Sequence, residues 1–237
     1  MKSRLNRAIA STGYCSRRKA DELIAAGKVS VNGKIVRDFN IEIDANKDEL
    51  KIEGKRFSVK RLDYILLYKP RGTVTTCQDE YDRETVLDLL PPELRHVRPV
   101  GRLDRDSEGL LILTNDGDLA QKLTHPSHEL FKRYQITVLG AIQSHALEQL
   151  AQGIQLEDGV TLPADVKLLK KSGEKSTFEI SIREGRNRQL RRMCAQVGYP
   201  VEHLVRVAIG ALQLRQMLPG EWRHLTFEEI GRLGSAK

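Results

Sequence analysis

The sequence predicts an α+β protein with two domains, a small one at residues 1–60 and a larger one at residues 61–237. Two observations support this fold class. The first 60 residues carry two stretches of helical spacing followed by short apolar runs that end in turns. The remainder mixes apolar strands with short amphipathic helices, without a regular strand–helix–strand rhythm. The small domain should therefore be an α/β unit, and the larger one a mixed, largely antiparallel sheet with flanking helices.

The small domain should contain two helices followed by a small sheet. Leu5, Ala8 and Ile9 have helical spacing, and Gly13 can end that helix. A second helix should follow the N-cap Ser16 and run over 17–26. Asn-Gly at 32–33 between two apolar runs predicts a tight hairpin, and further short strands are expected near 41–43 and 50–52. Residues 54–62 are charged and without periodicity, which predicts a linker.

The larger domain should be built on strands that are mostly buried. Strands are expected at 64–68 and 110–113 from continuous apolar runs, and at 134–138 and 178–182 from alternation. The helices expected between them cover 118–123, 144–152 and 187–197.

The composition indicates a soluble protein. The 237 residues are 40% apolar and 30% charged. No apolar run approaches the roughly 20 residues needed to span a bilayer, and the first seven residues lack the apolar stretch of a secretory signal. A cytoplasmic location is therefore expected.

The cysteines and histidines predict neither a disulfide framework nor a metal site. Cys15, Cys77 and Cys194 lie far apart, and no two cysteines form a CxxC pair. His125 and His128 flank a proline in a lone HxxH, a spacing that is weak support for metal ligation.

Basic residues gather in the small domain. The net charge of +7 favours polyanionic partners, of which nucleic acid is the commonest. By itself such a cluster fits a solvated helical face better than an RNA-binding surface. The candidates for RNA contact are Arg4, Arg7, Arg17, Arg18, Lys19, Lys28 and Lys34.

The small domain resembles the S4 RNA-binding domain. The matching pattern spans the whole block: Arg4-Leu5-Asn6, Ala8, Gly13, Cys15-Ser16-Arg17-Arg18, Ala20, Ile24, Gly27-Lys28-Val29 and Val31-Asn32-Gly33. The resemblance implies that the two helices lie on structured RNA, with Arg and Lys contacts to phosphates supplying most of the affinity.

Asp104 is the first candidate catalytic residue. It follows Arg102 and precedes Arg105 on a loop that leads into a buried strand. Loops at strand ends often carry catalytic groups, and nearby cations favour the ionised carboxylate. The residues alone fit a turn residue in a surface ion pair at least as well.

An aromatic residue and an Arg-rich helix add further candidates. Tyr134 can stack on a base drawn out of its helix, or can be a core aromatic with a paired hydroxyl. In the helix expected at 187–197, the spacing of the apolar residues turns one face inward. Arg188 and Arg192 should point away from this face toward solvent or phosphate, whereas Arg191 lies at its rim, where its guanidinium can be held against a carboxylate.

These segments together resemble the pseudouridine synthases, most closely the branch that carries an S4 domain and modifies ribosomal RNA. Gly101-Arg102-Leu103-Asp104, followed by Ser107, Gly109 and Leu110-Leu111, resembles the catalytic motif of the family. The resemblance implies that Asp104 is the essential carboxylate. The family pattern does not require Asp106 or Glu108, which are expected outside the site.

The same resemblance implies roles for the other candidates. Lys132-Arg133-Tyr134 is similar to the Lys-x-Tyr strand of the family, which implies that Tyr134 packs against the target base. The segment at 183–193 is similar to the motif whose Arg or Lys contacts the catalytic Asp. Arg191 is the preferred match and Arg188 the second choice. Arg102 is expected to bind substrate. The pattern from Val201 to Thr226 is typical of the same branch, with Leu204 as an apolar wall of the pocket.

The function implied is isomerisation of one uridine to pseudouridine in ribosomal RNA, free or in a pre-ribosomal particle, by a monomer that needs no metal or organic cofactor. The amino-acid sequence at 187–193 is more similar to large-subunit enzymes of this branch than to small-subunit ones, which favours 23S over 16S rRNA as the substrate. Whether Asp104 attacks the sugar, attacks the base or abstracts a ribose proton stays open. One alternative is a non-catalytic S4-domain RNA-binding or ribosome-assembly factor. Another is a hydrolase that pairs Asp104 with Asp106 or Glu108 and releases free uracil.

Overall fold

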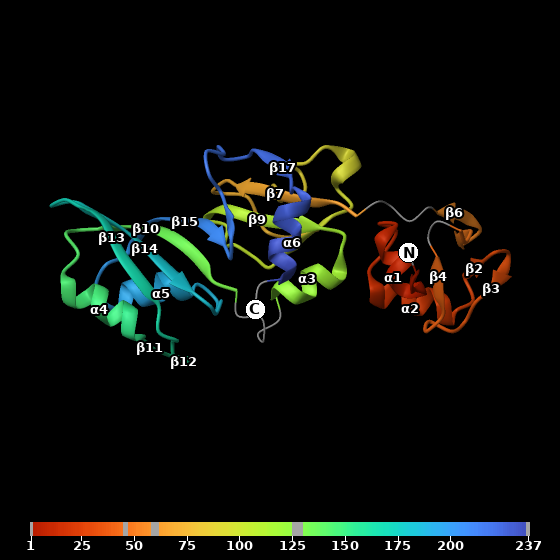
Figure 1. Cartoon of the computed structure of the whole chain (residues 1–237), viewed down its shortest axis with the longest axis horizontal. Coiled ribbons are helices and arrows are strands. Elements are labelled where there is room, and N and C mark those ends of the chain that lie inside the picture. Colours follow the sequence, from red (N-terminus) through yellow and green to blue (C-terminus); the bar gives the residue numbers. More distant parts are fainter. Residues whose placement is uncertain (1, 45–46, 58–61, 125–129, 236–237) are drawn as a thin grey trace. The chain divides into compact units, whose positions relative to one another are not determined.

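The computed structural model describes residues 2–44, 47–57, 62–124 and 130–235 (Figure 1). The chain forms two compact units. The first contains Met1–Asp63 with Pro91–Arg98 and Thr114–Gly117. The second contains Tyr64–Leu90, Pro99–Leu113 and Asp118–Lys237.

The first unit holds the two expected helices and two small sheets, but its first strand precedes the helices and was not expected. The helices are α1 (Leu5–Ser11) and α2 (Arg17–Ala25), and Ser16 caps α2 by accepting from the backbone N–H of Lys19 at 3.3 Å. One antiparallel pair joins β1 (Lys2–Arg4) and β4 (Glu42–Asp44). The other sheet has the order β3-β2-β5-β6, with bounds Lys34–Ile35, Val29–Val31, Leu50–Ile52 and Lys55–Phe57.

Strand β6 corrects the linker expected at 54–62. Its residues Lys55–Phe57 pair with β5 across a turn in which Glu53 and Gly54 have φ of 49° and 78°. Two positive φ values close a tight hairpin, as they also do at Asn32 and Gly33. A glutamate is an unusual residue at this turn position, so the sequence carried no hairpin signal there. Residues 58–61 of the expected linker lie outside the described residues.

The second unit is organised around one nine-stranded sheet. Its main path has the order β13-β14-β10-β15-β9-β7-β17, and β16 and β8 pair with β15 and β9 (Figure 1). The registers of β10 with β14 and β15, of β13 with β14 and of β7 with β17 are antiparallel, whereas β15 and β9 run parallel. This confirms the mixed, largely antiparallel sheet. The strands are β7 (Tyr64–Lys69), β8 (Arg98–Val100), β9 (Glu108–Thr114), β10 (Lys132–Leu139), β13 (Asp165–Lys171), β14 (Lys175–Ile182), β15 (Val201–Ile209), β16 (Leu212–Gln213) and β17 (Trp222–His224).

Helices cover this sheet over two separate cores. Side chains of α4 (Ser144–Gln152) and α5 (Gln189–Gln196) pack with β10 and β14 in one core. Side chains of α3 (Gly117–Thr124) and α6 (Phe227–Ser235) pack with β7 and β9 in the other. A 3₁₀ turn (Pro92–Leu94) and a small hairpin of β11 (Gln155–Leu156) and β12 (Gly159–Val160) complete the elements.

Gly109 brings the loop that holds Asp104 close to the sheet. It pairs with Arg206 in the parallel ladder of β9 and β15, with φ of 108°. A Cβ at this position would lie 2.4 Å from the Arg206 carbonyl oxygen and 2.6 Å from its nitrogen. Only glycine allows this approach. The glycine of the predicted catalytic motif therefore has a packing function.

Candidate active site

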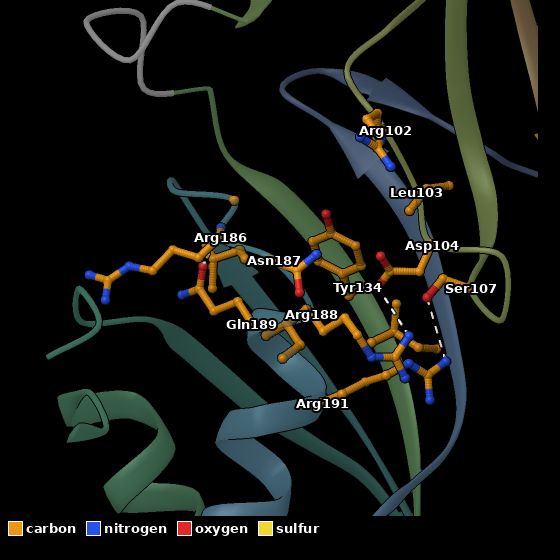
Figure 2. A pocket seen from close by; sticks show the side chains of 14 residues that line it. Arg102, Leu103, Asp104, Ser107, Tyr134, Arg186, Asn187, Arg188, Gln189 and Arg191 are labelled. Carbon is orange, nitrogen blue, oxygen red and sulfur yellow. Dashed lines mark hydrogen bonds and ion pairs between the residues drawn. The ribbon is translucent and has the colours of Figure 1, made fainter. Parts of the chain in front are cut away.

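A cavity of about 300 Å³ brings together the candidate residues of the larger domain. Its walls come from the loop before β9, from β10, from β15 and from the segment that leads into α5 (Figure 2). All six predicted residues line it: Asp104, Tyr134, Arg188, Arg191, Arg102 and Leu204. The outermost of them, Arg102 and Leu204, are 102 residues apart in the sequence, so the folded sheet makes them neighbours.

The Asp104 carboxylate is held in the cavity without a direct hydrogen bond. Its side chain is 34% exposed, and Figure 2 shows it directed toward the ring of Tyr134. Its nearest cation is Arg188, with Nη1 3.9 Å from Oδ2. Within the described part of the chain, no group donates a hydrogen bond to this carboxylate. Its oxygens are therefore free to act on a bound nucleotide.

The backbone around Asp104 is fixed from several sides. The Thr75 hydroxyl donates to the Leu103 carbonyl at 2.7 Å and accepts from the Leu103 N–H at 3.3 Å. The Ser107 N–H donates to the Asp104 carbonyl at 3.1 Å, and the Gly72 N–H donates to the Arg105 carbonyl at 2.8 Å. The main chain is thus held by hydrogen bonds, while the carboxylate itself has, among the described residues, only the ion pair with Arg188. Such preorganisation is what a catalytic group needs.

Lys69 anchors the same loop and was not among the predicted site residues. It ends β7 and is fully buried. Its ammonium donates to the carbonyls of Ser107 at 2.8 Å and Pro70 at 3.0 Å, with that of Arg105 at 3.5 Å. Burial lowers the pKa of Lys69 to about 8, although the nearby carboxylates of Glu108, Asp106 and Asp104 act to raise it. A lysine at the end of a continuous apolar run, just before a proline, was the available sequence signal.

Asp106 does not line the cavity, as expected from the family pattern, but its carboxylate contacts two arginines that do. Its carboxylate accepts two parallel hydrogen bonds from Arg188, at 3.0 and 2.9 Å. Arg191 approaches the same carboxylate with Nε at 3.2 Å and donates from Nη2 to the Asp106 carbonyl at 2.8 Å. The Arg188 contact is the main cause that lowers the pKa of Asp106. Glu108 does not line the cavity, as expected.

The two arginines therefore differ from the predicted assignment. The cation within 4 Å of Asp104 is Arg188, the second choice, and Arg191 contacts Asp106 and the Ser107 hydroxyl, the latter at 3.5 Å. The reason lies in the start of α5. Arg188 is the N-cap in the left-handed region, with φ of 46°, so the helix begins at Gln189 and not at Asn187. A helical projection could not place it, and its side chain turns into the cavity (Figure 2).

Arg192 lies within the helix and has a different partner. Its guanidinium binds the Asp158 carboxylate at 2.9 and 3.0 Å. It does not line the cavity. The expectation that Arg192 points away from the core face is consistent with this position.

Tyr134 is both a core residue and a wall of the cavity. It is 7% exposed and packs in the core under α4 and α5. It also lines the cavity, and its hydroxyl lies 3.5 Å from Nη1 of Arg206. In β10 it pairs with Arg206 of β15 and Ile180 of β14. The two interpretations drawn from the sequence are therefore compatible in one side chain.

The candidate RNA-binding residues all lie in the first unit, mostly on its surface. Arg17 and Arg18 are exposed at the start of α2. Lys19 binds Glu22 at 2.7 Å, and Lys28 binds Glu53 at 2.7 Å. Arg4 and Lys34 are exposed, and Arg7 is half-buried with a contact to Asp116 at 3.4 Å.

The described residues contain no cluster of three or more His, Cys, Asp or Glu side chains that could hold a metal ion. His125 and His128 lie outside the described residues. The same part of the chain has no helix that is long and apolar enough to cross a membrane.

Comparison with known proteins identifies both parts of the chain. Residues 63–196 match the family model described as RNA pseudouridylate synthase, and residues 3–47 match that of the S4 domain. The ribosomal large subunit pseudouridine synthase B of Bacillus subtilis is 43% identical over 97% of this chain and 95% of its own length. An uncharacterized RNA pseudouridine synthase of Aquifex aeolicus is 38% identical over 100% of this chain and 95% of its own.

A solved structure extends this likeness to the fold. A crystal structure of a pseudouridylate synthase superposes with a TM-score of 0.70 at 31% identity, over 97% of this chain and 99% of that one. The family match covers more than half of the 237 residues, including the loop of Asp104 and strand β10. The chain therefore belongs to the RNA pseudouridine synthase family, as a member with an N-terminal S4 domain.

Proposed function

We propose that this enzyme converts one uridine of large-subunit ribosomal RNA to pseudouridine, with Asp104 as its catalytic carboxylate. The observation that carries the proposal is the Asp104 carboxylate, which accepts no hydrogen bond from the described residues and faces Tyr134 in a cavity lined by Arg102, Arg188 and Arg191. Relatives that share almost the whole chain, from Bacillus subtilis and Vibrio cholerae, bear the name ribosomal large subunit pseudouridine synthase B. Their name supports the large subunit as the source of the substrate.

The reaction needs one carboxylate because no water enters. The glycosidic bond from N1 breaks, the uracil turns, and C5 forms the new bond to the same ribose carbon. Glycoside hydrolases instead require two carboxylates, because one must activate water. Asp104 is suited to act alone, since Asp106 is already occupied by Arg188 and Arg191. This occupancy also counts against the alternative of a hydrolase that uses both residues.

The remaining residues of the cavity would hold the extruded base. Removing a base from its stack costs a few kcal/mol. The Tyr134 ring, backed by the apolar core, offers a stacking surface that offsets this cost. Leu204 supplies a further apolar wall, and Arg102, Arg188 and Arg191 supply positive charge for the phosphates of the RNA.

The domain at 1–60 would carry the general affinity for RNA, and the domain at 61–237 the chemistry. The seven basic candidates of the S4 domain are Arg4, Arg7, Arg17, Arg18, Lys19, Lys28 and Lys34. Two of them, Lys19 and Lys28, already have carboxylate partners, so phosphate contacts there would compete with existing ion pairs. The enzyme would act as a cytoplasmic monomer without a metal or organic cofactor.

Pseudouridine mapping tests this proposal. Ribosomal RNA from cells with and without the gene is compared, and we expect one 23S position to lose its pseudouridine. Reintroduced wild-type protein should restore it, and the Asp104→Asn variant should not. An unchanged 23S pattern would contradict the substrate. Restoration by Asp104→Asn would instead favour the alternative of a non-catalytic RNA-binding or ribosome-assembly factor.

A further inference from the structure

A second cavity of about 520 Å³ adjoins the catalytic one. Its volume falls within the roughly 300–1,000 Å³ typical of ligand pockets. The two cavities share Arg102, Tyr134, Gly185 and Arg186, so one wall separates them. A polymer whose target residue occupies the first cavity would therefore bring its next residue to the second.

The floor of the second cavity is apolar. Four side chains form it, each at most 8% exposed: Ile112 of β9, Leu123 of α3, Ile209 of β15, and Leu130, which lies just before β10. A flat aromatic ring gains by covering such a surface, because apolar area leaves water. A bare phosphate would gain nothing from it.

The polar groups of this cavity are almost all donors. Arg206 is 3% exposed. Its Nε donates to the Leu110 carbonyl at 2.7 Å, and its Nη1 donates to the Arg102 carbonyl at 3.4 Å. Its buried Nη2 has no hydrogen-bond partner among the described residues. An unpaired buried donor of a charged group is costly, so an absent acceptor is indicated.

Two neighbouring cations point to the same kind of ligand. The half-buried Lys132 makes no hydrogen bond or ion pair within the described residues, and burial together with the Arg206 charge lowers its pKa. Arg102 is exposed at the shared wall. Among the described lining residues, the one carboxylate is Glu184, which already accepts from Arg186 at 3.0 Å and Gln189 at 2.6 Å. The cavity thus combines an apolar floor with unmet donors.

We propose that the second cavity binds the base of a nucleotide next to the target uridine, with a carbonyl oxygen of that base accepting from the guanidinium of Arg206. Guanine, uracil and cytosine carry such an oxygen, and adenine does not. The proposal rests on the pseudouridine synthase activity, since the RNA is anchored by the uridine in the catalytic cavity. The cavity would then contribute to the choice of site through the sequence beside the target.

A pair of substitutions at and just after strand β12 tests occupancy of the cavity. Leu162 lines it and is 47% exposed, whereas Val160 is 59% exposed, lies two residues earlier and does not line it. Leu162→Trp should fill the entrance, and Val160→Trp is the matched control. The substrate is a short synthetic RNA stem-loop that carries the uridine identified by pseudouridine mapping. Leu162→Trp should lower kcat/KM by about tenfold or more, the value of one stacked base, and Val160→Trp should not.

Altered RNAs identify what the cavity holds. The nucleotides on the 5′ and 3′ sides of the target are made abasic in turn. If a neighbouring base occupies the cavity, one abasic RNA should be a poor substrate for the wild-type enzyme, and Leu162→Trp should cost nothing further on it. Equal losses by Leu162→Trp on intact and both abasic RNAs would overturn the proposal, as would full activity of Leu162→Trp.

The hydrogen bond to Arg206 has its own test. Purine, which lacks a carbonyl oxygen, replaces the identified neighbour and should react more slowly than guanine in the same place, because it keeps the stacking contact but cannot accept from Arg206. Equal rates with purine and guanine would contradict the role of Arg206. These results are distinct from a failure of the proposed function, in which the wild-type enzyme would form no pseudouridine in any of the RNAs.

Discussion

The two units of the molecule use charge in opposite ways. In the second unit, the charged Lys69 and Arg206 are buried at the catalytic loop, where they donate to backbone carbonyls. In the first unit, the basic residues lie mostly on the surface, and Lys19 and Lys28 pair with exposed carboxylates. A buried charge fixes the local geometry, because losing one of its hydrogen bonds strongly destabilises the fold. A single surface charge contributes little, so the effect of surface charges depends on how many there are. Substitutions should therefore have large local effects in the second unit and small additive ones in the first.

The largest effect is expected at the catalytic carboxylate. Asp104→Asn should lower the rate of pseudouridine formation by about a thousandfold or more, because an amide cannot replace the ionised group. RNA affinity should change little, since phosphate contacts supply most of it. Rates are measured on the mapped RNA under single-turnover conditions. Asp165→Asn, at an exposed carboxylate of β13, is the control. A near-normal rate for Asp104→Asn would refute the catalytic assignment.

Two glycines separate crowding from backbone strain. Gly109→Ala should lower the free energy of unfolding by roughly 3 kcal/mol or more, because its Cβ would overlap the Arg206 backbone at a positive φ. Gly33 in the first unit has φ of 80°, but a Cβ added there would have no atom within 4 Å. Gly33→Ala should therefore lower the free energy of unfolding only by the backbone strain, about 1 kcal/mol. Urea unfolding measures both. Similar losses for the two variants would show that the close approach at Gly109 is unimportant.

Lys69 should give the second unit an unusual dependence of stability on pH. Its folded-state pKa of about 8 lies below the pKa of about 10.4 of an unfolded lysine. Between these two pH values the unfolded chain binds more protons than the folded chain. The contribution of Lys69 to the free energy of unfolding therefore rises as the pH increases from about 8 to about 10.4, and it is lost as the pH falls back through 8. Compared with Lys69→Met, the wild type should gain stability from pH 7 to pH 10.

Lys69→Met should also slow the reaction at pH 7, because the carbonyls of Ser107 and Pro70 lose their donor and the Asp104 loop loosens. Lys34→Met, at an exposed lysine of the first unit, should change neither quantity. A stability difference between wild type and Lys69→Met that is constant from pH 7 to pH 10 would contradict the lowered pKa.

The smallest effect is expected on the surface of the first unit. The double variant Arg17→Ala/Arg18→Ala should weaken RNA binding and reduce the slope of log K against log salt by about two, one for each lost phosphate contact. The rate at saturating RNA should stay unchanged. Lys167→Ala/Lys170→Ala, on exposed β13, is the matched control. An unaltered salt slope would mean that these two arginines do not contact phosphates.

Much of the fold follows from local patterns. The helix at Ser144–Gln152 and the strands around 64–68, 110–113, 134–138 and 178–182 were expected, because apolar periodicity reports directly on a buried face. Strand β13 was missed because its residues are mostly exposed and include three lysines, which removes the apolar signal. Strand β6 was missed because the turn before it has Glu53, a residue that is uncommon at a positive φ, at its first position.

The candidate site divides in the same way. Residue types and spacing, read with the family resemblance, were enough to select Asp104, Tyr134 and the Arg-rich segment, and the structure brings Asp104, Tyr134, Arg188 and Arg191 to one cavity. Which arginine faces Asp104 could not be read from spacing, since it depends on the left-handed conformation of Arg188. The contacts of Asp106 were missed for the same reason.

The sequence by itself determined the family and the identity of the candidate carboxylate, because these depend on short motifs. Only the tertiary structure decided how that carboxylate is held. Lys69, Gly109 and Arg206 lie on three different strands, and their roles come from hydrogen bonds and close contacts across the sheet. Such contacts join residues far apart in the chain, and a buried charge becomes recognisable only when its surroundings are known.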